Sequence, residues 1–305
     1  MKKALSVAAL ALAMTGSALA ADLPHYKAPL PPPPPPPPLW TGFYVGLNAG
    51  GTWANSNRLT LSNGPLVVDP TAGVVAIGPA TAAALGASGV FSTSNSAGFI
   101  GGGQIGYNWQ FYNGAALAGI EADIQGIANT RSTNTYFTGV PVTAGGFVAG
   151  FNAFQGIGVS KNLDYIGTVR GRLGWLFTPT LLVYGTGGLA YGGVQTSFSV
   201  VGAPIASPIP FTGWFGASSF SDTRVGWTAG GGLEWMFWPK WSAKVEYLYY
   251  DLGTVTSSAV SVSSTATGVA FANFLQSSAR FNGNIVRAGV NYHFNWGAPP
   301  VVAKY

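Results

Sequence analysis

The sequence predicts an all-β fold, an eight-stranded antiparallel up-and-down β-barrel that crosses a membrane with its strands. Three observations predict this fold. Charged residues make up only 8% of the chain, whereas 48% of it is hydrophobic. After the amino terminus, no stretch reaches the ~18 uninterrupted apolar residues of a membrane helix. Eight segments instead alternate apolar and polar residues, as strands do when one face meets lipid and the other a polar interior.

The first twenty residues have the three parts of a secretory signal peptide. Lys2 and Lys3 supply the positive start, residues 4–14 are apolar, and Ala18 and Ala20 form an Ala-x-Ala cleavage site. The apolar run is too short to span a bilayer, which takes ~20 residues. We therefore expect export and cleavage of residues 1–20. Cysteine is absent, which excludes a lipoprotein anchor and disulfides.

Residues 21–39 form a separate proline-rich segment with eight consecutive prolines at 31–38. Proline fixes φ and has no backbone N–H, so this run favours polyproline II at ~3.1 Å per residue, a spacer of roughly 25 Å. Its composition favours a plain periplasmic tether over a docking segment for a periplasmic partner. The barrel is expected over 40–296 and a periplasmic tail over 297–305.

Each predicted strand is at least as long as the ~9–11 residues that a tilted membrane strand needs. In the fifth, 181–194, both faces are apolar, so its orientation is left open. The other seven have one apolar face, listed here in chain order: 42–53 (Phe43, Val45, Leu47, Ala49, Trp53), 98–110 (Phe99, Ile105, Tyr107, Trp109), 115–127 (Ala116, Ala118, Ile120, Ala122, Ile124), 163–177 (Leu163, Tyr165, Val169, Leu173, Trp175, Phe177), 223–237 (Val225, Trp227, Leu233, Trp235, Phe237), 241–252 (Val245, Tyr247, Tyr249) and 284–294 (Val286, Ala288, Val290, Tyr292, Phe294).

The connections alternate in length. Three are tight turns, at 111–114, 178–180 and 238–240. Four are long, at 54–97, 128–162, 195–222 and 253–283. This asymmetry is typical of outer-membrane barrels, with short periplasmic turns and long extracellular loops. The long segments are rich in Ser, Thr, Asn, Gly and Ala and poor in charge, which favours mobile loops.

The face opposite the apolar one carries five acidic and five basic residues: Glu121, Asp123, Asp164, Glu234 and Glu246 with Arg170, Arg172, Arg224, Lys244 and Arg287. An Arg or Lys that faces lipid at midplane costs about 2–4 kcal/mol, so a bilayer enforces such segregation. Only Asp251 falls on the apolar side, at the outer end of its strand. The interior of an eight-stranded barrel is narrow, and isolated buried ions are penalised by several kcal/mol. We therefore predict a structural network of ion pairs in the lumen, in which Glu121 and Asp123 meet Arg170 and Arg172.

Small and aromatic residues complete the prediction. Inward glycines at 102, 106, 226 and 230 leave room for the long basic side chains. Aromatic residues gather at the short-turn ends of the strands, as in the interfacial girdle of a barrel. These are Trp109, Phe111, Trp175, Phe177, Trp235, Phe237, Trp238, Trp241, Phe294 and Trp296.

Several stretches resemble one protein family: "ADLP", "TGFYVGLNAGG", "AGIEADIQG", "TVRGRLGW", "KVEYLYYDLG" and "NIVRAGVNYHF". They resemble the small outer-membrane barrel proteins of alphaproteobacteria, of the Brucella and rhizobial major immunogen type, within the opacity-protein and OmpA-like group. The resemblance covers Trp40 to Trp296. It implies a structural and surface-interaction role in the cell outer membrane, and insertion by the barrel-assembly machinery. That machinery reads a final strand aromatic, here Phe294, although eleven residues follow and Tyr305 is the alternative.

Other function classes are weaker. Without Lys2 and Lys3 the net charge of the chain is +3, and the basic residues do not form a run. Nucleic acid is therefore not an expected partner. The two histidines, His25 and His293, lie on the periplasmic side, so no enzyme acting at the outer leaflet is expected. No metal and no cofactor are expected, because the acidic and basic residues balance and no histidine cluster exists.

The function predicted is a structural barrel with a closed lumen, in contact with outer-membrane lipid and lipopolysaccharide. Its loops are expected to meet host or environmental ligands. A small-solute pore is the nearest alternative. The adhesin and haem-binding receptor hypotheses are weaker. The predicted loops hold no histidine that could bind haem, and only aromatic residues such as Tyr136 and Trp214 could contact it.

Overall fold

The computed structural model describes residues 40–68, 77–94, 97–112, 114–128, 131–141, 152–202, 213–265 and 268–294. Contacts divide the chain into residues 1–37 and 38–305, and the described residues all belong to the second unit. The predicted signal peptide, the proline-rich segment 21–39, the tail 297–305 and the aromatic residues Trp296 and Tyr305 lie outside the described residues.

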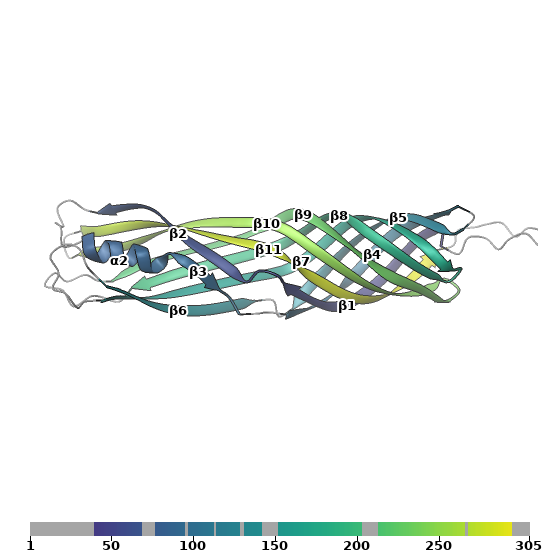
Figure 1. Ribbon diagram of the computed structural model, residues 1–305, viewed down its shortest axis with the longest axis horizontal. Coiled ribbons are helices and arrows are strands. Elements are labelled where there is room, and N and C mark those ends of the chain that lie inside the picture. Colours follow the sequence, from purple (N-terminus) through teal and green to yellow (C-terminus); the bar gives the residue numbers. More distant parts are fainter. Residues whose placement is uncertain are drawn as a thin grey trace, which may run out of the picture. The chain divides into compact units, whose positions relative to one another are not determined.

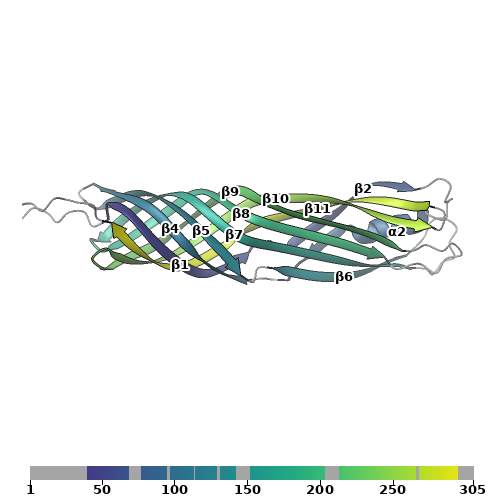
Figure 2. The ribbon, with the colours of Figure 1, turned by 180° about the vertical axis from the view of Figure 1, so that it is seen from behind.

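Eight strands pair with their neighbours in a closed antiparallel ring (Figures 1 and 2). In ring order they are β1 (Gly42–Ala54), β4 (Ala97–Phe111), β5 (Ala116–Ala128), β7 (Asn152–Thr178), β8 (Leu181–Gly202), β9 (Trp214–Trp238), β10 (Trp241–Thr265) and β11 (Gly268–Phe294). The ring closes because β11 pairs with β1, from Phe43 opposite Phe294 to Ala54 opposite Gly283. Each of the eight predicted segments corresponds to one of these strands.

Side chains alternate between the two faces of the ring because successive residues of a strand point to opposite sides. In β1, Leu47 is 74% exposed on the outside while Tyr44 and Asn48 are buried inside. The predicted aromatic girdle residues that the structure describes all lie at the end of the ring where β4–β5, β7–β8 and β9–β10 are joined by short turns, here called the short-turn end. Eight of them are exposed on the outer face and Phe294 is half-buried.

The prediction of four long loops is wrong over much of their length. Strands β7 to β11 have 22 to 27 residues, and β10 pairs with β11 as far as Thr265 opposite Gly268. In 253–265, Val255 and Ala259 are buried inside while Val260 is exposed outside. This alternation of β-branched and small residues is compatible with a strand, although the uncharged, Ser-rich composition of 253–265 also fits a loop.

Three further strands and a helix continue the ring beyond the ends of β1, β4 and β5, at what is here called the extended end. β2 (Arg58–Val68) pairs with β11 beyond β1, and β6 (Ser132–Pro141) pairs with β7 beyond β5. β3 (Gly89–Ser92) pairs with β2. Helix α2 (Ile77–Ala87) packs beside them (Figure 1). Within the described residues, no helix is both long and apolar enough to cross a membrane.

A bulge in β7 separates two kinds of interior. The register with β8 shifts between Leu163 and Tyr165, and one extra residue moves every later side chain to the other face. Towards the short-turn end the even-numbered residues, such as Arg170, point inward. Towards the extended end the odd-numbered residues do so, among them Ile157 and Val159. The extended end is therefore filled by an apolar core that includes buried alanines of α2.

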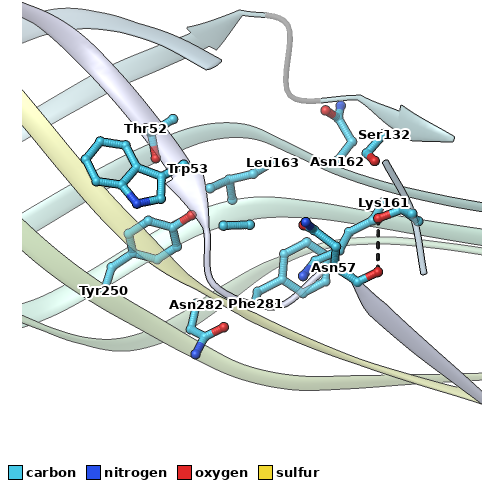
Figure 3. A pocket seen from close by; sticks show the side chains of 12 residues that line it. Thr52, Trp53, Asn57, Ser132, Lys161, Asn162, Leu163, Tyr250, Phe281 and Asn282 are labelled. Atoms are coloured by element: carbon cyan, nitrogen blue, oxygen red, sulfur yellow. Dashed lines mark hydrogen bonds between the residues drawn. The ribbon is translucent and has the colours of Figure 1, made fainter. Parts of the chain in front are cut away.

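A cavity of about 30 Å³ lies where the two interiors meet, near the ends of β1 and β4 (Figure 3). Lys161 lines it and is only 6% exposed. Its Nζ donates to the carbonyl oxygens of Ser56 at 2.6 Å and Arg280 at 2.5 Å, and lies 4.5 Å from the ring centroid of Phe281. Among the described residues, no carboxylate forms a salt bridge with it. Burial lowers the pKa of Lys161 to about 8.

The free energy of unfolding of the wild-type chain is expected to rise relative to that of Lys161→Met as the pH increases from about 8 towards 10.5. The ordinary lysine pKa is 10.5 and the folded one about 8, so the unfolded chain binds more protons in this window and higher pH favours folding. Below pH 8 the full cost of burying the charge remains. The difference is at most about 1.4 kcal/mol per pH unit.

Chemical unfolding in detergent micelles at several pH values measures this difference. Lys240→Met, at an exposed turn, is the control and should keep the wild-type pH profile. A wild-type profile that runs parallel to that of Lys161→Met would contradict the expectation.

Candidate functional site: a buried ion-pair cluster

Eight of the ten charged residues predicted to face the lumen lie in one cluster inside the ring, here called the ion-pair cluster. All eight are at most 5% exposed. They come from five strands: Glu121 and Asp123 on β5, Arg170 and Arg172 on β7, Glu234 on β9, Lys244 and Glu246 on β10, and Arg287 on β11. The cluster holds four acidic and four basic groups, so it is formally neutral.

Arg170 is at the centre of the cluster. Its guanidinium donates to Glu121 and, at 2.9 Å, to Asp123, both on the neighbouring strand β5. It also reaches Glu246 on β10 at 2.9 Å. Glu121 lies directly opposite Arg170 in the β5–β7 register. Arg170 therefore joins β7 to its neighbour β5 and, through the interior, to β10.

Arg287 and Lys244 complete the pairing of the acidic groups. Arg287 donates to Asp123 and to Glu246, each at 2.8 Å. Lys244 donates to both carboxylate oxygens of Glu121 at 3.0 Å. Each of these three carboxylates thus accepts bonds from at least two basic groups, which offsets the cost of removing it from water.

Arg172 lies on the side of the cluster nearer the short-turn end. It donates to Glu234 at 2.6 Å and to the hydroxyl of Tyr44 at 2.9 Å. The Tyr44 hydroxyl donates in turn to Glu121 at 2.6 Å. The guanidinium also lies 4.1 Å from the ring centroid of Tyr184. Arg172 itself lies 3.6 Å from the Glu121 carboxylate. The predicted interaction between these two residues is therefore mainly indirect, through the hydroxyl of Tyr44.

Two predicted members lie outside the cluster. Asp164 sits at the β7 bulge, where it accepts hydrogen bonds from Gln195 at 2.6 Å and from Asn162. The alternation of apolar and polar residues in the sequence gives no sign of the extra residue at this bulge. Arg224 lies where the β9–β10 ladder is interrupted, between Asp251 and Val262 of β10, and donates to the carbonyl of Thr254 at 3.0 Å.

Glu234 continues the cluster into a chain of neutral polar groups. It accepts hydrogen bonds from Asn291 at 2.7 Å and from Ser242 at 2.6 Å. Ser242 is also 2.8 Å from Nε2 of His293. The prediction did not include these partners. Ser242 has the same parity as Lys244 on β10, and Asn291 and His293 have the same parity as Arg287 on β11, which is the signal that identifies them.

An apolar cluster closes the ring at the short-turn end. Trp40 is 1% exposed, donates through Nε1 to the carbonyl of Pro179 at 2.9 Å, and meets His293 edge to face at 5.5 Å. It belongs to a buried group with Leu117, Leu176, Leu182, Tyr184 and Met236. The interior is therefore filled by Trp40 and its neighbours, then by the ion-pair cluster, then by the apolar core.

Glycines make room for several cluster side chains, although not all of those predicted. A Cβ at Gly106 would collide with the Tyr44 hydroxyl, and one at Gly119 would lie 3.1 Å from Cγ of Arg172. At positions 102, 226 and 230 the nearest atoms are those of other residues, mainly backbone of the adjacent strand. Gly106 thus positions Tyr44, which bridges Arg172 and Glu121.

The chemistry of this arrangement is that of pairing rather than of ligand capture. Among the described residues, no group of three or more His, Cys, Asp or Glu side chains is placed to hold a metal ion. The carboxylates of the cluster are all bonded to basic groups of the same chain.

Comparison with known proteins places the chain in a family. Residues 6–294 match the family described as the outer membrane protein beta-barrel domain. The chain belongs to this family. The 31 kDa outer-membrane immunogenic protein of Brucella melitensis is 33% identical over 294 residues, which cover 96% of this chain and all of that protein.

Two other proteins are similar to this outer membrane beta-barrel protein. The 22 kDa outer membrane protein of Rhizobium leguminosarum bv. viciae is 31% identical over 152 residues, 49% of this chain and 52% of that protein. The solved structure of the outer membrane protein OprG from Pseudomonas aeruginosa covers 83% of this chain and 97% of its own, with 11% identity and a TM-score of 0.31. The protein is located in the cell outer membrane, where membrane lipid surrounds it.

Removal of one cluster carboxylate is expected to destabilise the fold strongly. Glu246→Gln leaves Arg170 and Arg287 without a full counter-charge in a buried site, which costs about 3–5 kcal/mol. Asp164→Asn is the matched control, because it removes one acid outside the cluster and should cost about 1 kcal/mol or less. Urea unfolding in detergent micelles measures both, and equal losses for the two variants would contradict the expectation.

Proposed function

We propose that the chain is a structural outer-membrane barrel with a closed lumen, whose short turns face the periplasm and whose extended end faces outside. The filling of the ring along its length carries this proposal. Trp40 and its apolar neighbours, the ion-pair cluster and the apolar core follow one another along the described part of the ring. An eight-stranded ring has an interior that side chains can fill.

The outer face supports the same proposal. Exposed apolar residues cover it from the aromatic girdle to about the level of Val169 on β7, Val225 on β9 and Val286 on β11. The ion-pair cluster lies inside this same zone, so charge and lipid are on opposite sides of one wall. Beyond it, outward residues become mainly hydroxyl and amide side chains. A membrane-spanning zone bounded in this way is what lipid requires of a barrel.

The ion-pair cluster has a structural role in this proposal. Its eight charges are stable inside the ring only when paired, since an unpaired buried ion is penalised by several kcal/mol. Pairs such as Arg170 with Glu246 join β7 to β10 across the lumen. The cluster therefore favours one relative placement of the strands over others with slipped register.

The two ends of the barrel have different proposed partners. At the periplasmic side, Phe294 is the last residue of β11 and packs edge to face on Tyr292 at 5.0 Å; we assign it as the aromatic that the barrel-assembly machinery reads. At the extended end, β2, β3 and β6 and the outward faces of β7, β8 and β9 form the surface for lipopolysaccharide and for host or environmental ligands.

A narrow pore is the second candidate, and one observation favours it. Beside the ion-pair cluster, one oxygen of Asp123, both side-chain polar atoms of Gln125 and one nitrogen of Arg287 have no hydrogen-bond partner within the described residues. Buried polar atoms are normally bonded to protein or water, so water is expected at these positions. Ion leakage would need such water on both sides of the cluster to connect.

Planar-bilayer recording tests the closed lumen. The purified wild type is expected to give no reproducible conductance steps. Arg170→Ala/Glu246→Ala removes one opposite pair from the cluster, keeps it neutral, and is expected to give small steps. Leu47→Ala, on the outer face, is the control and should stay silent. Large steps from the wild type would contradict a closed lumen and favour the pore.

No enzymatic activity is part of the proposed function. Ser242 and His293 lie within hydrogen-bond reach, as a nucleophile and its base would, but both are buried inside the ring behind Trp40. Purified protein in detergent is expected to hydrolyse phospholipids and simple esters no faster than Ser242→Ala. Wild-type turnover that this substitution abolishes would contradict the expectation.

A further inference from the structure

The outer wall beyond the lipid-facing zone carries an ordered row of hydroxyl groups. Thr133 on β6, Ser160 on β7, Ser197 on β8 and Ser219 on β9 are direct cross-strand partners, each opposite the next. All four point outward and are exposed or half-exposed. Strands lie ~4.8 Å apart in this direction, so the row presents one hydroxyl at each such step.

A parallel row of apolar residues lies four positions further along the same strands. Phe137, Gly156, Val201 and Phe215 are again consecutive cross-strand partners. Phe137 is 85% exposed and Phe215 60% exposed. The two rows and the positions between them, which include Thr135, Gly158 and Ser199, form a surface here called the hydroxyl groove.

The hydroxyl groove is hollow. The hydroxyl row and the positions between the two rows line a hollow of about 470 Å³ that contains no charged residue, and the apolar row lies beside this hollow. Gly158 on β7 lines the hollow without filling it, and a Cβ there would stand 2.8 Å from the hydroxyl of Ser199. Within the described residues, no hydrogen bond engages the hydroxyls of Thr133, Thr135, Ser160, Ser197, Ser199 or Ser219 as donors or acceptors. The groove thus offers unused donors and acceptors beside exposed aromatic rings.

We propose that the hydroxyl groove binds the neutral sugar units of lipopolysaccharide in the cell's own outer membrane. A sugar ring presents hydroxyl edges and an apolar C–H face, which match a row of free hydroxyls beside a row of aromatic and aliphatic side chains. A volume of this size lies within the ordinary range for small-ligand sites. The absence of charge excludes phosphate and carboxylate groups as the main recognised feature.

The position of the groove identifies the source of the sugar. The groove opens sideways on the wall, and Ser219 is six residues beyond Val225, the last exposed apolar residue of the lipid-facing zone on β9. Six strand residues span about 20 Å along the strand, which is about 15 Å along the membrane normal at the ~40° tilt of membrane strands. The groove therefore lies outside the hydrocarbon and beside the saccharide layer of the same membrane. This inference rests on the proposed orientation of the barrel.

Binding of delipidated polysaccharide, released from the lipopolysaccharide of the same bacterium and fluorescently labelled, tests the inference. Purified full-length protein in detergent is expected to bind it saturably. Gly158→Leu fills the groove and is expected to weaken binding at least about tenfold. Thr256→Leu places the same side chain on the outer wall of β10, outside the groove, and is the matched control; its affinity should stay within about twofold of wild type.

Each other outcome contradicts the inference. Equal binding by the wild type and Gly158→Leu would place the sugar elsewhere. Binding of lipid A alone, without the polysaccharide, would assign recognition to the lipid. Self-association that Gly158→Leu abolishes would make a second copy of the chain the occupant. Retained heat-modifiable migration in gels verifies that both variants are folded.

Cysteine labelling separates failure of this inference from failure of the proposed function. The chain contains no cysteine, so Ser197→Cys introduces a unique thiol in the groove. On intact cells, a membrane-impermeant maleimide is expected to label it. Labelling without polysaccharide binding overturns the sugar site alone. Absence of labelling on intact cells, with labelling after lysis, overturns the proposed orientation and the sugar site with it.

Discussion

The constraint on which the structure depends is that charges buried inside the ring must find partners there. Four acids and four bases are enclosed within a wall whose other side is apolar. Water cannot solvate them freely, so their pairing has to be geometric: Arg170 reaches Glu121 on one neighbour and Glu246 across the ring. Because a strand that slips by one residue turns these groups towards lipid, the pairing and the strand register support each other.

The same strands build two different interiors, and the bulge at Asp164 is the point of change. On one side of it the inner face of β7 carries Thr168, Arg170 and Arg172; on the other it carries Val159 and Ile157. The charged interior coincides with the lipid-facing zone, where outward residues must be apolar. The apolar interior coincides with a hydroxyl-rich outer wall. Both parts of the sheet, the one around the charged interior and the one around the apolar interior, therefore have one apolar face. Such a sheet is stable with its other face against polar groups or water.

Much of the ring follows from residue order alone, because a period of two is visible in the sequence. The pairing of Glu121 and Asp123 with Arg170 needs only adjacent strands and matching parity. The misses have physical causes. Asp164 is displaced by a bulge that leaves no mark in the alternation. Residues 253–265 form part of a strand, but their serine-rich composition is also typical of a loop. The prediction did not include Tyr44 and Trp40, because it considered charged residues and these two are neutral hydrogen-bond donors. It did not include helix α2, because an Ala-rich stretch of 11 residues also fits a loop.

Closure of the ring between β1 and β11 has a consequence for how the protein is made. Phe43 meets Phe294 although about 250 positions separate them in the chain. The first strand thus has one unsatisfied hydrogen-bonding edge until the final strand has been synthesised and exported. Such an edge invites pairing with other chains, and contacts this distant in sequence form slowly. The nascent polypeptide must therefore be shielded in transit, and any truncation that removes β11 is expected to leave an aggregation-prone open sheet.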